Sequence, residues 1–204
     1  MRAPVKLFLA SSNPGKLVEY RALAATATTS LPVELELLPD FGTLPAFDEK
    51  APTFAENAAG KALHYSRLRN GLVLADDSGL VVPALGGAPG VHSARYAGPQ
   101  ATSGQKIEKL LGALQAKTGE GRSAYFVCAI ALAELGQARA IVTGRVDGEI
   151  LEAPRGTGGF GYDPVFYIPA LGKTFAEIPS EEKNHCSHRG KAFRRLLAAL
   201  SSML

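Results

Sequence analysis

Leu72-Val73-Leu74-Ala75-Asp76-Asp77-Ser78-Gly79 sets four apolar residues directly before two carboxylates, a hydroxyl and a glycine. A short apolar run that stops at polar and turn-forming residues is typical of a buried strand in an α/β sheet. We therefore predict a strand from Leu72 to Ala75 that ends on Asp76-Asp77-Ser78-Gly79. Because ligands of α/β folds gather where strands stop, this stretch is also the first candidate for chemistry.

Strands and helices alternate along the chain on both sides of this stretch. The apolar spacing predicts strands at residues 5–10 and 35–38, and helices over residues 16–27, 53–69 and 105–117. Thr53-Phe54-Ala55-Glu56 has the form of a capping box, which starts the second of these helices.

The C-terminal half adds a hairpin and a last helix. Residues 124–132 and 140–150 are rich in β-forming residues and predict two strands joined through Leu135-Gly136-Gln137. The last helix has an apolar stripe made of Phe193, Leu196, Leu197, Leu200 and Leu204. These elements predict an α/β fold, with a mixed central sheet flanked by helices, in a single domain over residues 1–204.

The composition is that of a globular protein. Hydrophobic residues make up 46% of the 204 residues and charged residues 20%. A net charge of +3 is compatible with anionic ligands but too small to indicate nucleic acid binding. Cys128 and Cys186 lie far apart, which suits a reducing compartment, and no apolar stretch approaches the ~20 residues of a membrane span. We expect a cytoplasmic protein without a membrane or nucleic-acid partner.

The loop Ser11-Ser12-Asn13-Pro14-Gly15-Lys16 follows the first predicted strand and opens the first predicted helix. The N–H groups at a helix N-terminus favour phosphate, and Lys16 adds a full positive charge. The loop is not a Walker A motif, because Ala10 stands where a glycine is needed and a leucine follows Lys16. The alternative interpretation is an ordinary strand-to-helix turn.

Adjacent carboxylates at the end of an apolar strand, here Asp76 and Asp77, are costly unless a cation or a donor compensates them. Their hard oxygens suit Mg²⁺, which also contacts substrate phosphates. Either carboxylate could instead accept a proton from an attacking water. The alternative is a turn in which an aspartate caps the next segment.

The segment from Gly156 to Asp163 contains a literal G-x-G-x-x-G pattern. A dinucleotide-binding loop should open a helix, whereas Tyr162-Asp163-Pro164-Val165-Phe166 predicts extended chain. We interpret the segment as a flexible wall in which Phe160 and Tyr162 offer an aromatic face to a base. A long surface hairpin loop is the alternative.

The segment from Lys183 to Lys191 leads into the last helix. Ser187 is a natural N-cap, which places His188 and Arg189 in the first helical turn. Positive side chains there oppose the helix dipole, so we expect an anion or a strong acceptor beside them. His185, Cys186 and His188 do not indicate zinc, because no second pair of ligands has the required spacing.

Taken together, these segments resemble the inosine triphosphate pyrophosphatase family, which acts on noncanonical purine nucleotides. The matching stretches occur in the family's order and span residues 5 to about 195. They are Leu9-Ala10-Ser11-Ser12-Asn13-Pro14-Gly15-Lys16, Thr53-Phe54-Ala55-Glu56-Asn57-Ala58 with Lys61-Ala62, Ala75-Asp76-Asp77-Ser78-Gly79-Leu80, Leu85-Gly86-Gly87-Ala88-Pro89-Gly90-Val91, Ser93-Ala94-Arg95-Tyr96, Gly156 to Pro164, and Ser187-His188-Arg189-Gly190. The chain departs from the family at His185-Cys186, where small or aliphatic residues are more usual.

The resemblance implies two lobes around a central cleft, a homodimer, and Mg²⁺-dependent hydrolysis of ITP, dITP and XTP to the monophosphate and pyrophosphate. It implies that Asp77 activates water and helps to hold the metal. A second metal-linked acid falls on Asp48 by direct spacing, with Glu49 next to it. The resemblance assigns triphosphate contacts to Ser11, Ser12, Asn13, Pro14, Gly15, Lys16, Lys61 and Ser78, and the purine site to Phe160, Gly161, Tyr162, Asp163, Lys183, His188 and Arg189.

This assignment changes one prediction made from the residues alone. The helix-terminus argument sends His188 and Arg189 to a phosphate, whereas the resemblance sends them to the 6-oxo group of the purine. Three rival functions remain open: a pyrophosphatase for modified pyrimidine or methylated nucleotides, a nucleotide sensor without turnover, and a nucleic-acid binder based on the five Lys and Arg of residues 183–195.

Overall fold

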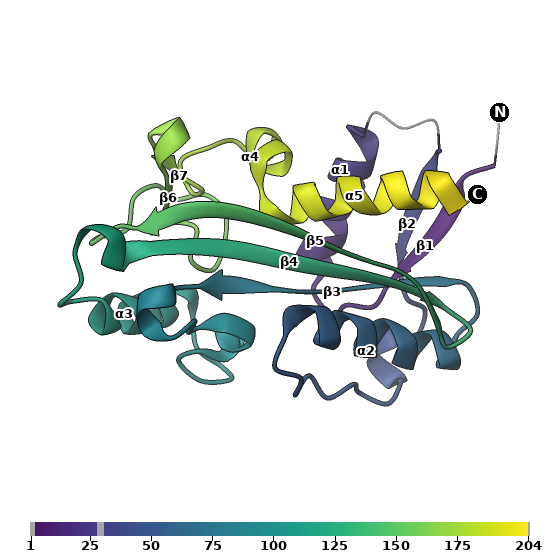
Figure 1. The fold of residues 1–204 in the computed structure, drawn as a ribbon. Helices are drawn as coiled ribbons and strands as arrows, with labels where there is room; N and C mark the ends of the chain where they lie inside the picture. Colours follow the sequence, from purple (N-terminus) through teal and green to yellow (C-terminus); the bar gives the residue numbers. More distant parts are fainter. Residues whose placement is uncertain (1–2, 28–30, 204) are drawn as a thin grey trace. The chain divides into compact units, whose positions relative to one another are not determined.

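The computed structural model describes residues 3–27 and 31–203 (Figure 1). Seven strands form one sheet in the order β2-β1-β3-β4-β5-β6-β7. The strands are β1 (Val5–Leu9), β2 (Val33–Leu37), β3 (Leu72–Val81), β4 (Ser123–Glu134), β5 (Gln137–Ile150), β6 (Phe166–Ile168) and β7 (Lys173–Thr174). The helices are α1 (Pro14–Ala25), α2 (Phe54–Leu68), α3 (Ser103–Ala113), α4 (Ser180–Cys186) and α5 (His188–Met203).

The sheet is mixed in direction, as predicted. β1 runs parallel to β2 and to β3, whereas β5 pairs antiparallel with β6, and β6 with β7. β4 and β5 are neighbours separated only by Leu135 and Gly136, which confirms the predicted hairpin.

The chain divides into two compact units, each assembled from separate stretches of sequence. The first consists of Met1–Asp77, Cys128–Gly144 and His188–Leu204, and the second of Ser78–Val127 and Arg145–Ser187. These two units correspond to the two lobes that the resemblance implies. The central cleft and the single domain stay predictions.

The first unit has a hydrophobic core on each face of its strands. On one face, Leu74 of β3 belongs to a cluster with Tyr20 of α1 and Phe193 of α5. On the other face, Val73 and Ala75 pack in a cluster with residues of α2. Figure 1 shows α2 on the opposite side of β3 from α1 and α5. Successive residues of β3 therefore face different helices.

The second unit has its own core, in which α3 packs with aromatic residues. Phe126 of β4 meets Phe166 of β6 edge to face, with ring centroids 4.7 Å apart, and Phe166 stacks on Phe175 at 5.2 Å. Thr102 and Gln105 form a capping box at the start of α3. The sequence analysis did not predict this capping box.

β3 is longer than predicted. It continues through Asp76, Asp77, Ser78 and Gly79 to Val81, so the two carboxylates lie inside the strand and not at its end. The physical reason is that Leu80 and Val82 are fully buried and extend the apolar pattern beyond the polar residues. The prediction of a strand that ends on Asp76 was therefore wrong.

Two other predictions need correction. Residues 162–165, predicted as extended chain, form turns in which the N–H groups of Val165 and Phe166 both donate to the Tyr162 carbonyl oxygen. Residues 183–186, for which no helix is predicted above, lie in α4, whose polar sequence has no apolar stripe to indicate a helix. In α5, Phe193, Leu196, Leu197 and Leu200 are buried as predicted, whereas Leu204 lies outside the described residues.

Candidate active site

The Ser11–Lys16 loop is held by its own side chains. Oδ1 of Asn13 accepts a hydrogen bond from the Gly15 N–H at 2.9 Å, and Oγ of Ser11 accepts one from the Asn13 N–H at 3.1 Å. Asn13 is thereby the N-cap of α1, and Pro14 takes the first helical position, where a missing N–H costs nothing. The loop connects β1 to α1 as predicted, and Lys16 follows in the first turn.

Asp76 is the centre of a buried ion cluster in the first unit. Its side chain has no exposed surface, and its Oδ1 accepts a hydrogen bond from Nζ of Lys16 at 2.8 Å. Its Oδ2 lies 3.6 Å from Nε of Arg189. Burial alone would raise the pKa of Asp76, but the charges of Lys16, Arg189 and Lys61 hold its pKa well below the usual value.

Arg189 lies in the first turn of α5 and is 2% exposed. Its Nη1 donates to Oε2 of Glu19 at 2.6 Å, so two carboxylates, those of Glu19 and Asp76, flank one guanidinium. Burial opposes the charged form, yet Glu19 and Asp76 outweigh it and raise the pKa of Arg189. The anion expected beside this helix terminus is therefore supplied by the protein itself.

Asp77 lies on the α2 side of β3. Nδ2 of Asn57 donates to its Oδ2 at 3.0 Å, and the same amide also exchanges hydrogen bonds with the backbone of Ala51. The pKa of Asp77 is raised, first by burial and then by the negative charge of Glu49, against the opposing hydrogen bond from Asn57. Asp77 is thus a partly buried carboxylate with increased proton affinity.

Glu49, and not Asp48, is the acid associated with Asp77. Glu49 forms an ion pair with Lys61 of α2. The charges of Asp76, Glu49 and Asp77 together raise the pKa of Lys61 against the effect of its burial. The Asp48 side chain is 64% exposed and pairs with Lys50 at the surface. The structure thus favours Glu49 as the second acid, and the choice between Asp48 and Glu49 stays a prediction.

A magnesium ion fits this part of the first unit. Among the described residues, no group of three or more His, Cys, Asp and Glu side chains could hold a metal. Mg²⁺ in nucleotide sites, however, is usually bound through one or two carboxylates together with substrate phosphates and water. Asp77 and Glu49 repel one another, which a cation between them would relieve. Asp76 is less suited, because two cations already surround it.

The second unit carries Ser78 and the predicted residues from Phe160 to Lys183, whereas His188 belongs to the first unit and is 7% exposed. Oδ2 of Asp163 accepts hydrogen bonds from the Phe160 N–H at 2.7 Å and from Nζ of Lys183. Lys183 also lies over the Phe160 ring, 4.6 Å from its centroid, while the Phe160 side chain is exposed. Phe160 is therefore accessible to solvent, and its role as an aromatic face for a base stays a prediction.

Tyr162, by contrast, does not offer its ring to a base. It is 4% exposed, and its hydroxyl donates to the Ser93 carbonyl oxygen at 2.9 Å. Gly161 donates its N–H to Oγ of Ser103 at 3.3 Å. The contribution of Tyr162 is therefore to anchor the glycine-rich segment, which corrects the sequence interpretation.

Ser78, a predicted triphosphate contact, lies half-buried in β3, directly after Asp77.

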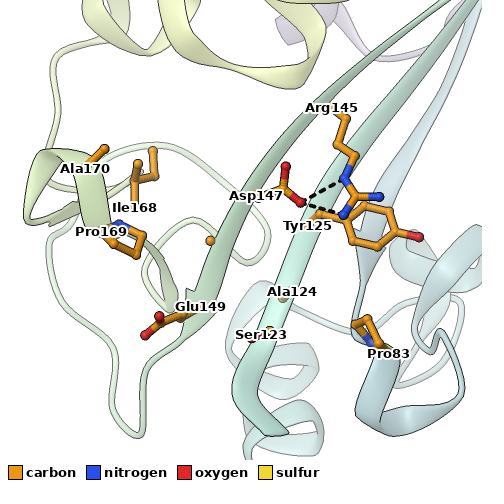
Figure 2. Close-up of a pocket in the computed structure, with 11 residues that line it drawn as sticks. Pro83, Ser123, Ala124, Tyr125, Arg145, Asp147, Glu149, Ile168, Pro169 and Ala170 are labelled. Atoms are coloured by element: carbon orange, nitrogen blue, oxygen red, sulfur yellow. Dashed lines mark hydrogen bonds and ion pairs between the residues drawn. The ribbon is translucent and has the colours of Figure 1, made fainter. Parts of the chain in front are cut away.

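A pocket of about 480 Å³ in the second unit holds none of the predicted residues (Figure 2). Arg145 stacks over the Tyr125 ring at 3.5 Å and pairs with Asp147, so its charge is compensated within the pocket wall. The pocket offers no reactive group comparable to Asp77.

Comparisons with known proteins identify the family of this chain. The profile of the Ham1 family matches residues 7–199. This chain belongs to the Ham1 family. Among its relatives, the dITP/XTP pyrophosphatase of Geobacillus kaustophilus is 51% identical over 94% of this chain and 92% of the relative, and that of Gloeobacter violaceus is 49% identical over 96% and 94%.

Solved structures of the Ham1 family have the same fold. A HAM1 protein from Coxiella burnetii superposes with a TM-score of 0.85 at 42% identity, covering 97% of this chain and 99% of that one. The Ham1 protein of Staphylococcus aureus gives a TM-score of 0.85 at 37% identity, covering 98% and 100%. The resemblance read from the ordered motifs is thereby confirmed.

Sequence reasoning missed two residues of this Ham1-family chain. Asn57 was quoted only as part of a matching motif, and Glu19 was not considered. A signal for Glu19 existed, because it lies three residues after Lys16 and so shares a face of α1 with it. Asn57 is a polar residue of α2 that is only 1% exposed, and this burial is revealed by the structure.

Proposed function

We propose that this chain hydrolyses noncanonical purine nucleoside triphosphates, of the ITP, dITP and XTP type, to the monophosphate and pyrophosphate. The observation that carries the proposal is the placement of Asp77, a carboxylate of raised pKa, among Asn57, Glu49 and Lys61. This arrangement can activate water beside a polyphosphate. The names of the relatives as dITP/XTP pyrophosphatases support the same activity.

Asp77 accepts the proton of the attacking water. A carboxylate of raised pKa is a stronger base toward the proton of a water. The amide of Asn57, itself fixed to the Ala51 backbone, orients the Asp77 carboxylate. Lys16 and Lys61 offset the charge of the polyphosphate, so that stabilisation is mainly electrostatic and positional.

Asp77 and Glu49 would hold Mg²⁺. When bound, the ion would withdraw charge from phosphate oxygens and would lower the pKa of a bound water. This assignment uses Glu49 as the second acid, because Asp48 is engaged with Lys50 at the surface. Asp76 is left to orient Lys16 and Arg189.

In the first unit, the resemblance assigns recognition of the purine 6-oxo group to His188 and Arg189. In the second unit, it assigns contacts with the base to Lys183 and an aromatic face to Phe160. Donors that meet an oxo group would face the amino group of adenine and stay unpaired, which typically costs a few kcal/mol. The preference for ITP over ATP follows from that difference.

A nucleotide panel tests the proposed activity. Initial rates for ITP, dITP, XTP, GTP, ATP and a modified pyrimidine triphosphate, with pyrophosphate detection, should give kcat/KM values for ITP and XTP roughly 100-fold or more above that for ATP. EDTA should abolish turnover. Preferred hydrolysis of the pyrimidine would favour the rival pyrophosphatase, and binding without turnover would favour a sensor.

We also propose that the protein is a homodimer, as the resemblance implies. We propose a cytoplasmic location because the two cysteines lie far apart, which suits a reducing compartment. Light scattering after size exclusion should give twice the 21.4 kDa chain mass, and a monomer would contradict the proposal. Within residues 3–27 and 31–203, no helix is long and apolar enough to cross a bilayer.

A further inference from the structure

Glu19 of α1 is a buried acid that the proposed mechanism does not use. Its carboxylate contacts Nη1 of Arg189 at 2.6 Å, and the two side chains are only 14% and 3% exposed. An ion pair with so little solvent contact fixes both groups, because leaving either charge alone in the protein interior is costly. Glu19 therefore restricts where the Arg189 guanidinium can lie.

Glu19 is one end of a chain of alternating charges within the first unit. The order is Glu19, Arg189, Asp76 and Lys16, joined by contacts of 2.6, 3.6 and 2.8 Å. Both ends of this chain come from α1, three residues apart, whereas Asp76 comes from β3 and Arg189 from α5. With two acids and two bases, the cluster is neutral only while all four are present.

The geometry shows what the Glu19 charge prevents. Nε of Arg189 lies 3.6 Å from Asp76, an ion pair longer than a hydrogen bond, while Lys16 holds the other oxygen of Asp76 at 2.8 Å. The guanidinium also lies over the Tyr20 ring, 6.0 Å from its centroid. Without Glu19, Asp76 would be the nearest carboxylate, and Arg189 would move toward it and compete with Lys16.

We propose that Glu19 is a positioning residue that holds the Arg189 guanidinium where it selects the 6-oxo purine and keeps it from displacing Lys16 on Asp76. This inference rests on the proposed function, because it takes Arg189 as a purine-reading group. It adds a residue that neither contacts the metal nor belongs to any motif of the resemblance.

Kinetic measurements on Glu19→Gln test the role of the charge. The variant keeps the size of the side chain and one acceptor oxygen but removes the charge, and we expect the ratio of kcat/KM for ITP to that for ATP to fall roughly tenfold or more. The KM for ITP should rise more than kcat falls. Glu36→Gln is the matched control, since Glu36 pairs with Lys6 at 2.9 Å on the surface, and its ratio should equal that of wild type.

A double-mutant comparison separates positioning from a merely structural effect. If Glu19 acts through Arg189, then Glu19→Gln/Arg189→Ala should have the same ITP-to-ATP ratio as Arg189→Ala alone. A ratio that falls by the same factor in both backgrounds, or that does not change in Glu19→Gln, would overturn the proposal. Should Glu19→Gln not fold, Glu19→Asp serves, with a ratio expected between those of wild type and Arg189→Ala; an unchanged ratio contradicts us.

A measurement without nucleotide keeps this inference separate from the proposed function. In ¹⁵N-arginine-labelled protein, the side-chain N–H signals of Arg189, assigned with Arg189→Lys, should be sharp and slow to exchange in wild type. They should shift and exchange faster in Glu19→Gln but not in Glu36→Gln. Identical signals in all three proteins would overturn the positioning of Arg189 by Glu19. Absence of ITP turnover in wild type, with the signals as expected, would overturn the proposed function and leave that positioning without a role in purine selection.

Discussion

Asp76 and Asp77 are neighbours with opposite properties, and the reason is the two-residue period of a strand. Asp76 shares the α1 and α5 face with Lys16 and Arg189, which lower its pKa, whereas Asp77 faces Asn57 of α2 and has a raised pKa. One acid is therefore fixed in its ionised form by cations, and the other is able to take up a proton.

Asp76→Asn should destabilise the protein by about 3 kcal/mol, because it leaves Lys16 and Arg189 without their shared carboxylate. The pKa of Asp76 is lower in the folded than in the unfolded chain, so its stabilisation is complete above the unfolded value of about 4 and disappears as pH falls through the folded value. Thermal unfolding should show a Tm roughly 6 to 12 °C below wild type at pH 7.

The pH dependence provides the control for this prediction. The difference in Tm between wild type and Asp76→Asn should narrow as pH falls below about 4. Asp48→Asn, which removes an exposed acid, should leave Tm nearly unchanged at every pH. A constant difference across the pH range would mean that the charge of Asp76 is not what stabilises the fold.

Asn57→Ala should shift the pH profile of the enzyme. The Asn57 amide lowers the pKa of Asp77, so its removal raises that pKa further and moves the acid limb of kcat/KM to higher pH. Activity at neutral pH should fall about tenfold, since the carboxylate also loses its orientation. Initial rates of ITP hydrolysis over pH 5–9 would check this, with the exposed Asn70→Ala as control; an unmoved acid limb would contradict it.

Much of the chemistry at this scale could be predicted from the sequence, because motif residues such as Lys16 and Asp77 lie in short ordered stretches. Partners could not. Glu19 meets Arg189 across 170 positions of the chain, and no local pattern reports such a pairing. The proposed choice of Glu49 over Asp48 likewise depends on their ion pairs with Lys61 and Lys50, which only the structure shows.

At the scale of elements, the start of α5 packs closely against β5 because β5 has a glycine at the point of contact. A Cβ atom on Gly144 would lie 2.1 Å from the His188 carbonyl oxygen and 2.5 Å from the Ala192 nitrogen. These are backbone atoms of the helix that carries Arg189, so they cannot move without moving the helix.

Gly144→Ala should therefore destabilise the protein by about 2 kcal/mol and reduce the ITP-over-ATP preference, because the first turn of α5 is displaced. Gly112→Ala is the matched control: no atom lies within 4 Å of its added Cβ in α3, and alanine favours helix. Denaturation and kinetics of both variants would decide this. Equal stability of Gly144→Ala and wild type would show that β5 and α5 are not in close contact.

Regular amphipathic elements were predictable from periodicity, as α2, α5 and the β4–β5 hairpin show. The continuation of β3 through two aspartates was not predictable from periodicity. The free-energy cost of burying Asp76 in the strand is offset by positive charges from α1 and α5. α4 is also invisible to periodicity, since its sequence Ser180–Cys186 is polar.

For the whole molecule, the sequence indicated a mixed α/β sheet but not the order of its seven strands. That order depends on pairings such as β1 with β3, which are separated by two helices and a strand. The division into two units was likewise implied only by the resemblance, because each unit combines distant segments.

The central claim is that Asp77 activates water for cleavage between the α- and β-phosphates. The most direct test is to quantify all products of ITP and Mg²⁺ with purified wild type and Asp77→Asn. We predict equal amounts of IMP and pyrophosphate from wild type, and a rate roughly 10²- to 10⁴-fold lower from a variant that still unfolds cooperatively. IDP with orthophosphate, or a near-normal rate from Asp77→Asn, would contradict the account.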